Sequence, residues 1–289
     1  MNPAFSISRI HPQGIRSCEI WNLPFRDGLL HQSLSGDTLP EKPTDLAATL
    51  LETLQLIRQH DHNFDLAFLC GGLSSLHGLR EATENFPIPV HFALEPQFIS
   101  LTAAPVLREF LGLGSHPPLW IVDIGPSHLK ISLQSRLTTR CVFKRPARLP
   151  ISFVDKALHF SPDDALTLAQ ESLDWFSDCF SQIRVRTEPR CHLVVGLPCD
   201  IDDALSLAPC AYPGWDRRKA FGSTIVSAIG NAIFAQGCLV QSAALVNDAE
   251  LAACGALAQL SKEGVAYNNA LVLSLGFGPE AAILSRRVP

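Results

Sequence analysis

The sequence contains no run of basic residues and has few charged residues overall. Only 18% of its 289 residues are charged, with 28 acidic against 23 basic side chains, whereas 47% are hydrophobic. This composition excludes an intrinsically disordered chain and favours a globular one. The lack of a basic run and the slight acidic excess argue against a nucleic-acid partner. A chain of this length can form one large domain or two lobes.

Paired cysteines and uninterrupted apolar stretches are also missing. None of the nine cysteines forms a C-x-x-C pair. Because they are scattered and odd in number, we interpret them as reduced, mostly buried thiols of a cytoplasmic protein. The first ten residues lack the basic and apolar segments of a signal peptide. The most apolar long window, 224–246, is broken by polar residues and glycines, which favours a core helix and a turn over a membrane span.

The element pattern changes at residues 112–118, GLGSHPP, which predict a linker. Beyond the linker the predicted order of elements is βββαβαβα. Its strands are expected over 119–124, 128–134, 138–144, 191–197 and 239–246, and its helices over 162–183, 217–236 and 249–260.

The rest of the chain gives the same order if its two ends are joined. Strands over 270–275 and 280–284 would come first, followed by a strand from the N-terminal region. Further elements are predicted as strands over 5–10, 15–21, 65–70 and 90–93 and as helices over 44–60, 76–84 and 96–113. We therefore predict an α/β chain of two similar lobes, formed by residues 1–113 with 268–289 and by residues 119–267.

Residues 119–133, LWIVDIGPSHLKISL, predict a buried strand, a tight turn and a second strand. Asp123 could hold a magnesium ion at the end of the first strand, and Gly125 would let backbone approach an anion. Ser127 and Lys130 follow directly. An ordinary hairpin with an Asp-Gly turn has the same pattern, and Lys130 could equally be a solvated strand residue.

Two such lobes with facing glycine turns resemble the actin-like ATPase superfamily, which includes sugar kinases, acetate kinase, actin and the heat-shock ATPases. IVDIGPSHLK resembles its first phosphate motif, and LVLSLGFG resembles its second phosphate loop. LAFLCGGLSSLHGLREA resembles its adenosine motif. ALVNDAELAACGAL is similar to the N-D-A segment of ROK and glucokinase-type kinases, the nearest members. The adenosine-type segment comes first here, which implies a circular permutation.

The resemblance implies two ribonuclease-H-like lobes around a cleft that binds ATP and Mg²⁺. Asp123 would be the metal ligand, and Asp248 the general base. Gly125, Ser127, Lys130, Gly276 and Gly278 would contact the phosphates, and Gly71, Gly72 and Ser74 would border the nucleoside. Two alternatives stay open: Asn247 or Asp248 could cap the helix that follows, and the paired glycines could form only a strand-to-helix turn.

The function implied is a magnesium-dependent phosphotransferase acting on a small hydroxylated or carboxylated metabolite. Two departures from the phosphate motifs of the superfamily favour a different function. The chain would then be a non-catalytic or ATPase-only actin-like protein with a regulatory or assembly role. Pro126 has no N–H to offer a phosphate, and Glu280 would repel one. An unrelated two-domain α/β protein is a third reading. We expect neither a membrane nor a nucleic-acid partner, and a homodimer is one candidate assembly. Trp215 could belong to an interface, to a cleft lid or to the core.

Overall fold

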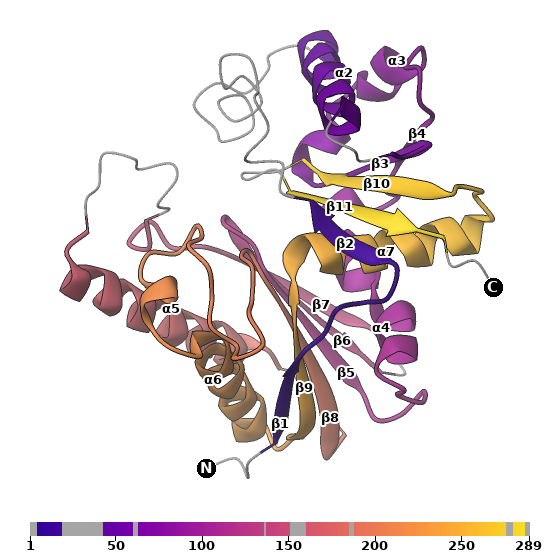
Figure 1. Cartoon of the computed structure of the whole chain (residues 1–289). Coiled ribbons are helices and arrows are strands. Elements are labelled where there is room, and N and C mark those ends of the chain that lie inside the picture. Colours follow the sequence, from indigo (N-terminus) through magenta and orange to yellow (C-terminus); the bar gives the residue numbers. More distant parts are fainter. Residues whose placement is uncertain are drawn as a thin grey trace. The chain divides into compact units, whose positions relative to one another are not determined.

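The computed structural model describes residues 5–18, 43–59, 63–135, 137–150, 160–184, 188–275 and 280–286. The chain forms two compact units, residues 1–10 with 108–248 and residues 11–107 with 249–289. Within the described residues, one sheet belongs to each unit (Figure 1). The predicted mixed α/β class with two sheets is therefore confirmed. The sequence analysis drew its lobe boundaries at residues 113, 119 and 268 instead.

The first sheet has the strand order β1-β9-β8-β5-β6-β7. Its strands, in chain order, are β1 (Ser6–Arg9), β5 (Leu119–Ile124), β6 (His128–Gln134), β7 (Thr139–Lys144), β8 (Arg190–Leu197) and β9 (Leu239–Asn247). The strands β5, β6 and β7 are antiparallel neighbours, whereas β8, β9 and β1 continue parallel to β5. The predicted bounds of β5 and β6 and their antiparallel pairing are confirmed. The pairing of β1 with β9 was not predicted.

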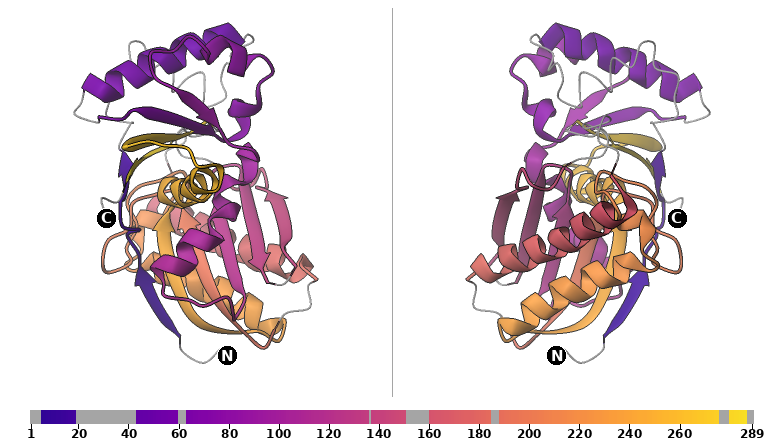
Figure 2. Two further views of the ribbon diagram at one scale, coloured as in Figure 1. Left: turned by 90° about the vertical axis from the view of Figure 1, so that its right-hand side faces the viewer. Right: turned by 90° about the vertical axis from the view of Figure 1, so that its left-hand side faces the viewer.

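Helices α5 (Pro162–Gln182) and α6 (Phe221–Ala235) cover one face of this sheet (Figures 1 and 2). The Oγ of Ser161 accepts a hydrogen bond from the Asp164 N–H at 3.1 Å, so the predicted N-cap of α5 is confirmed. Trp120 of β5 packs on Phe180 of α5, with ring centroids 5.7 Å apart. Trp215 is fully buried and belongs to the core of this unit.

The second sheet has the strand order β2-β11-β10-β3-β4. Its strands are β2 (Ile15–Cys18), β3 (Leu66–Cys70), β4 (Val90–Phe92), β10 (Asn269–Ser274) and β11 (Glu280–Ser285). Antiparallel pairs join β10, β11 and β2, and parallel pairs join β10, β3 and β4. The strands β7-β6-β5-β8-β9 of the first sheet show the same succession, in which two antiparallel pairs are followed by two parallel pairs. The prediction that a strand from the N-terminal region joins the two C-terminal strands in one sheet is confirmed for β2. The strand β1, which was expected in the same lobe, instead belongs to the first sheet. The circular permutation and the ribonuclease-H-like identity remain predictions.

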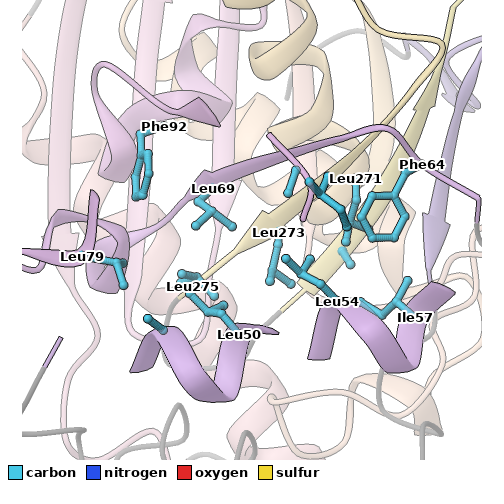
Figure 3. Close-up of a cluster of buried hydrophobic side chains, with 14 of the residues drawn as sticks. Leu50, Leu54, Ile57, Phe64, Leu69, Leu79, Phe92, Leu271, Leu273 and Leu275 are labelled. Carbon is cyan, nitrogen blue, oxygen red and sulfur yellow. The ribbon is translucent and has the colours of Figure 1, made fainter. Parts of the chain in front are cut away.

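The core of the second unit lies between its sheet and α2 (Pro43–Gln59) (Figure 3). Apolar residues recur along α2 at spacings of three and four, which places them on one face of the helix. Leu50, Leu54 and Ile57 of that face point toward Leu271 and Leu273 of β10. Burial of these apolar side chains stabilises the unit by about 25 cal/mol per Å² of apolar surface removed from water.

Among the described residues, the remaining α-helices are α3 (Leu79–Thr83), α4 (Ala104–Phe110) and α7 (Asp248–Glu263). Three predicted helices proved too long. The one expected over 76–84 is reduced to α3, and the one over 96–113 begins as a 3-10 helix (Pro96–Thr102) before α4. The one over 217–236 starts only at Phe221, because Ala220 has a left-handed backbone with φ 52°. In the part of the chain that is described, no helix is long and apolar enough to cross a membrane.

Candidate functional site

The two predicted catalytic carboxylates, Asp123 and Asp248, share one edge of the first sheet. In the strand register Asp123 of β5 lies beside Gly196 of β8, which lies beside Val246 of β9. Because these three strands are parallel, their carboxyl ends meet at the same edge. Asp248 is two residues beyond Val246, at the start of α7. Two strand spacings, about 10 Å, separate the outer strands, so the fold brings Asp123 and Asp248 into one region.

Asp123 forms a partly buried ion pair with Lys130. The two residues are opposite one another in the β5–β6 hairpin, and Lys130 Nζ lies 2.9 Å from Asp123 Oδ2. The exposed fractions of the two side chains are 7% for Asp123 and 26% for Lys130. Lys130 is therefore held against the carboxylate and is not a solvated strand residue.

The backbone of the turn between these two strands is largely committed to contacts within the protein. The Gly125 N–H donates to the His128 carbonyl oxygen at 3.0 Å, and Pro126 has no N–H. The Ser127 carbonyl accepts from the Arg145 N–H at 2.9 Å, and the Ser127 hydroxyl lies 2.9 Å from Nδ1 of His128. An anion at this turn would therefore find few backbone donors and would depend on side chains.

Tyr212 fixes the other side of the turn. Its hydroxyl donates to the Gly125 carbonyl at 3.0 Å, and its ring stacks on Trp215 with centroids 4.3 Å apart. The Trp215 indole N–H in turn donates to Oγ of Ser172 in α5 at 2.9 Å. Burial raises the pKa of Tyr212 well above its usual value, so the phenol stays protonated and remains a donor. The sequence analysis missed this residue, and no local pattern around it indicates the contact.

Positive side chains gather near the same turn. His128 lies opposite Lys144 in the β6–β7 pairing and two residues from Lys130, so all three project from one face of the sheet. Burial lowers the pKa of His128, and the positive charges of Lys130 and Lys144 lower it further. The turn is thus an electropositive environment in which a neutral imidazole is favoured.

Asp248 lies among buried polar groups at the end of β9. Asp248 is 6% exposed, and the side-chain amide of the preceding Asn247 donates to the Cys199 carbonyl at 3.1 Å. The pKa of the Cys199 thiol is raised, first by its contact with Cys210, then by burial and by the negative charges of Asp248 and Asp200. The positive end of α7 stabilises a carboxylate at this position. Both roles proposed for Asp248, helix capping and general base, remain predictions.

The predicted nucleoside residues belong to the second unit, and the structure gives two of them a packing role. Gly71 has φ 84°, and a Cβ there would lie 2.4 Å from the Leu275 carbonyl oxygen. The Ser74 hydroxyl donates to the Gly71 carbonyl at 2.7 Å. A Cβ added at Gly72 would meet no atom within 4 Å. Gly276 and Gly278 lie outside the described residues.

Magnesium bound directly to Asp123 does not fit this arrangement. A direct Mg²⁺–oxygen contact is about 2.1 Å long, so the ion would sit beside an ammonium group that is already 2.9 Å from the same carboxylate. Among the described residues, no group of three or more His, Cys, Asp or Glu side chains is placed to hold a metal ion.

Comparisons with known proteins give only distant structural similarities. No protein-family model and no curated protein matches the chain. An Aquifex aeolicus PPX-GPPA enzyme is 11% identical, with a TM-score of 0.40 over 78% of this chain and 86% of its own. An exopolyphosphatase-like protein is 12% identical, with a TM-score of 0.39 over 79% and 88%. The crystal structure of the Aquifex aeolicus Ppx/GppA family member is 13% identical, with a TM-score of 0.35 over 86% and 83%.

None of these three structures is described as a ROK or glucokinase-type kinase, the group to which the sequence motifs appeared nearest. At these identities and TM-scores, the similarity establishes neither the family nor the function of this chain.

Proposed function

We propose that the chain binds the phosphate groups of a nucleotide at the carboxyl edge of the first sheet and cleaves off the terminal phosphoryl group. One observation supports this most strongly: Asp123 and Asp248 stand at the ends of β5 and β9, on either side of β8. Phosphoryl transfer depends mainly on positioning and charge neutralisation. A carboxylate beside the acceptor can take up the acceptor's proton, which is the role given to Asp248.

Water is the proposed acceptor. Asp248 is only 6% exposed, and water needs less room beside it than any metabolite. The water oxygen forms a bond to the terminal phosphorus, the bond from that phosphorus to the bridging oxygen breaks, and Asp248 takes a proton from the water. The products are inorganic phosphate and the shortened nucleotide. Water takes the place of the small metabolite that the sequence resemblance implies as the acceptor.

The test is release of inorganic phosphate from ATP, measured for the wild-type chain and for Asp248→Asn. Removal of a general base is expected to lower the rate by about 100-fold or more. The matched control is Asp200→Asn, which removes a carboxylate from the loop after β8 and should leave most of the activity. If folded wild-type protein releases no phosphate above the blank, the hydrolytic function is wrong.

A second candidate is nucleotide binding without catalysis, in a regulatory or assembly role. It is favoured by the β5–β6 turn, where Pro126 has no N–H and the Gly125 N–H already donates to His128. Neither group can then stabilise charge on a transferring phosphoryl group. Calorimetric binding of ATP without phosphate release would support this function. Sedimentation of the chain with and without ATP would show whether binding changes its oligomeric state, including the homodimer considered from the sequence.

A further inference from the structure

We propose that the Lys130 ammonium takes the place of a divalent cation at Asp123, so that the first unit binds phosphate groups without magnesium. This rests on the proposed function in one respect, namely that phosphate groups bind at this edge of the sheet. It departs from the magnesium requirement implied by the sequence.

The ion pair already meets the electrostatic need of the buried carboxylate. Asp123 is 5% exposed, and a carboxylate removed from water needs a nearby positive charge and hydrogen-bond donors. Lys130 Nζ supplies both at 2.9 Å from Oδ2. The strand register fixes this pairing, because Asp123 and Lys130 are direct cross-strand partners in the hairpin. A magnesium ion would first have to displace the ammonium.

The face of the sheet that carries Asp123 also carries further positive charge. Trp120 packs against α5, so alternation along β5 directs Asp123 to the opposite face. Lys130 shares that face, and so do His128 and Lys144, which lie opposite each other in the β6–β7 pairing. With the His128 imidazole neutral, the two lysines still outnumber the one carboxylate among these four residues, and the excess positive charge suits a ligand with several negative charges.

Because the backbone of the turn offers few hydrogen-bond donors, these side chains would make most of the contacts to a bound phosphate group. Gly125 and Pro126 offer no N–H to a ligand, for the reasons given above. Charged hydrogen-bond donors bind phosphate more strongly than neutral ones, and a lysine serves as a point charge. Lys130 and Lys144, with the hydroxyl of Ser127 at the turn, would then contact the phosphates directly. The ligand would be the metal-free polyphosphate group of a nucleotide.

The decisive experiment is calorimetric titration of the wild-type chain with ATP and with inorganic tripolyphosphate, in EDTA and in excess Mg²⁺. The affinity should be equal or higher in EDTA, because Mg²⁺ neutralises charge on the ligand that the cationic side chains would otherwise bind. Binding that requires Mg²⁺ would overturn the inference while leaving the proposed function intact.

Lys130→Met keeps an unbranched side chain that is one heavy atom shorter, and it removes the charge. In EDTA this variant should bind about tenfold or more weakly, because charged hydrogen bonds to the ligand are lost. Added Mg²⁺ should now strengthen binding, since the Asp123 carboxylate has lost its ammonium partner. Lys144→Met is the matched control: it removes the same charge nearby and should weaken binding without creating a response to Mg²⁺. An unchanged metal response in Lys130→Met would contradict the inference.

A readout without nucleotide separates this inference from the proposed function. Mg²⁺ alone should raise the thermal unfolding temperature of Lys130→Met but not that of the wild type, because only the variant gains an ion at Asp123.

If Lys130→Met does not fold, the double variant Asp123→Asn with Lys130→Met removes both charges, and it should bind both ligands weakly with or without metal. If neither ATP nor tripolyphosphate binds to the wild type, the proposed function fails. The magnesium-only melting curves then still decide the role of Lys130.

Discussion

The hydroxyl of Tyr212 donates a hydrogen bond of 3.0 Å to the carbonyl oxygen of Gly125, a residue 87 positions earlier in the chain. Tyr212 is buried and is itself held by stacking on Trp215. The turn that follows Asp123 is thus fixed from the loop region before α6, so that its position depends on side chains remote in sequence.

Replacing Tyr212 with Phe should lower the free energy of unfolding by about 1 to 3 kcal/mol, because a partly buried carbonyl loses its donor. Urea denaturation would measure this. The other tyrosine of the chain gives the control: Tyr267→Phe, at a half-buried position of the second unit, should change the free energy by less than about 0.5 kcal/mol. Equal losses in the two variants would show that the contact with Gly125 has no special importance.

The paired glycines Gly71 and Gly72 should respond differently to alanine. Gly71→Ala forces a side chain into a left-handed conformation and toward the Leu275 carbonyl, so we expect a loss of roughly 2 kcal/mol or more in unfolding free energy. Gly72→Ala meets no atom within 4 Å and should leave stability nearly unchanged. If Gly72 borders a nucleoside as the sequence resemblance implies, this same variant should weaken ATP binding, which calorimetry would detect. Unaltered binding would remove Gly72 from the site.

The carboxylate of Asp65 should make stability depend on pH. Burial alone would raise the pKa of Asp65, but hydrogen bonds from the backbone N–H groups of Asn268 and Asn269 and from the Asn268 side chain bring it below its usual value. A lowered pKa in the folded state means that the ionised carboxylate stabilises the fold above about pH 4 and that this contribution is lost as the pH falls through the folded-state pKa.

Asp65→Asn should therefore be less stable than the wild type at neutral pH, and the difference should shrink at acid pH. Urea denaturation of both proteins across the acid range would measure it. Asp203→Asn, at an exposed turn position, serves as the control and should show no such trend. A constant difference between Asp65→Asn and the wild type at every pH would rule out the ionised form as its cause.

Loss of the cap at the start of α5 should be measurable on its own. Ser161→Ala removes the acceptor of the Asp164 N–H, and the expected cost is about 1 kcal/mol of unfolding free energy. Ser181→Ala, near the other end of the helix, removes a hydroxyl that only donates to the Asp178 carbonyl and should cost less. The cap would be unimportant if chemical denaturation gave the same value for both variants.

Local patterns in the sequence were enough to predict much of the fold. The strands β5 and β6 were predicted at their observed bounds because apolar residues and a Gly-Pro turn define them locally. The contact between Asp123 and Lys130 also follows from that hairpin, since its register makes the two residues direct partners. It could have been inferred from the sequence, but Lys130 was instead considered as a phosphate contact or as a solvated residue.

Other features could not be read from the sequence because they depend on contacts between distant segments. The edge strand β1 pairs with β9, more than two hundred residues later, and nothing in its own residues selects that partner. Tyr212 likewise contacts Gly125 from a distant segment, where it stacks on Trp215, and the Trp215 indole donates to Ser172 of α5. Asp123 and Asp248 share a sheet edge because β5, β8 and β9 are parallel neighbours. The predicted order of elements indicates this arrangement, but it does not give the residue-by-residue register of the strands.

The strand order of the second sheet has a consequence for how the protein folds during synthesis. The strand β3 pairs with β10, and the hydrogen bonds at the start of this pair join residues 203 positions apart. At ribosomal rates of about 5 to 20 residues per second, roughly 10 to 40 s pass between the synthesis of the two strands. During that interval the apolar face of α2 and one edge of β3 lack their partner, which makes the nascent second unit prone to aggregation. The first unit needs no residue beyond Asp248, so it can fold while the second unit waits for its central strand.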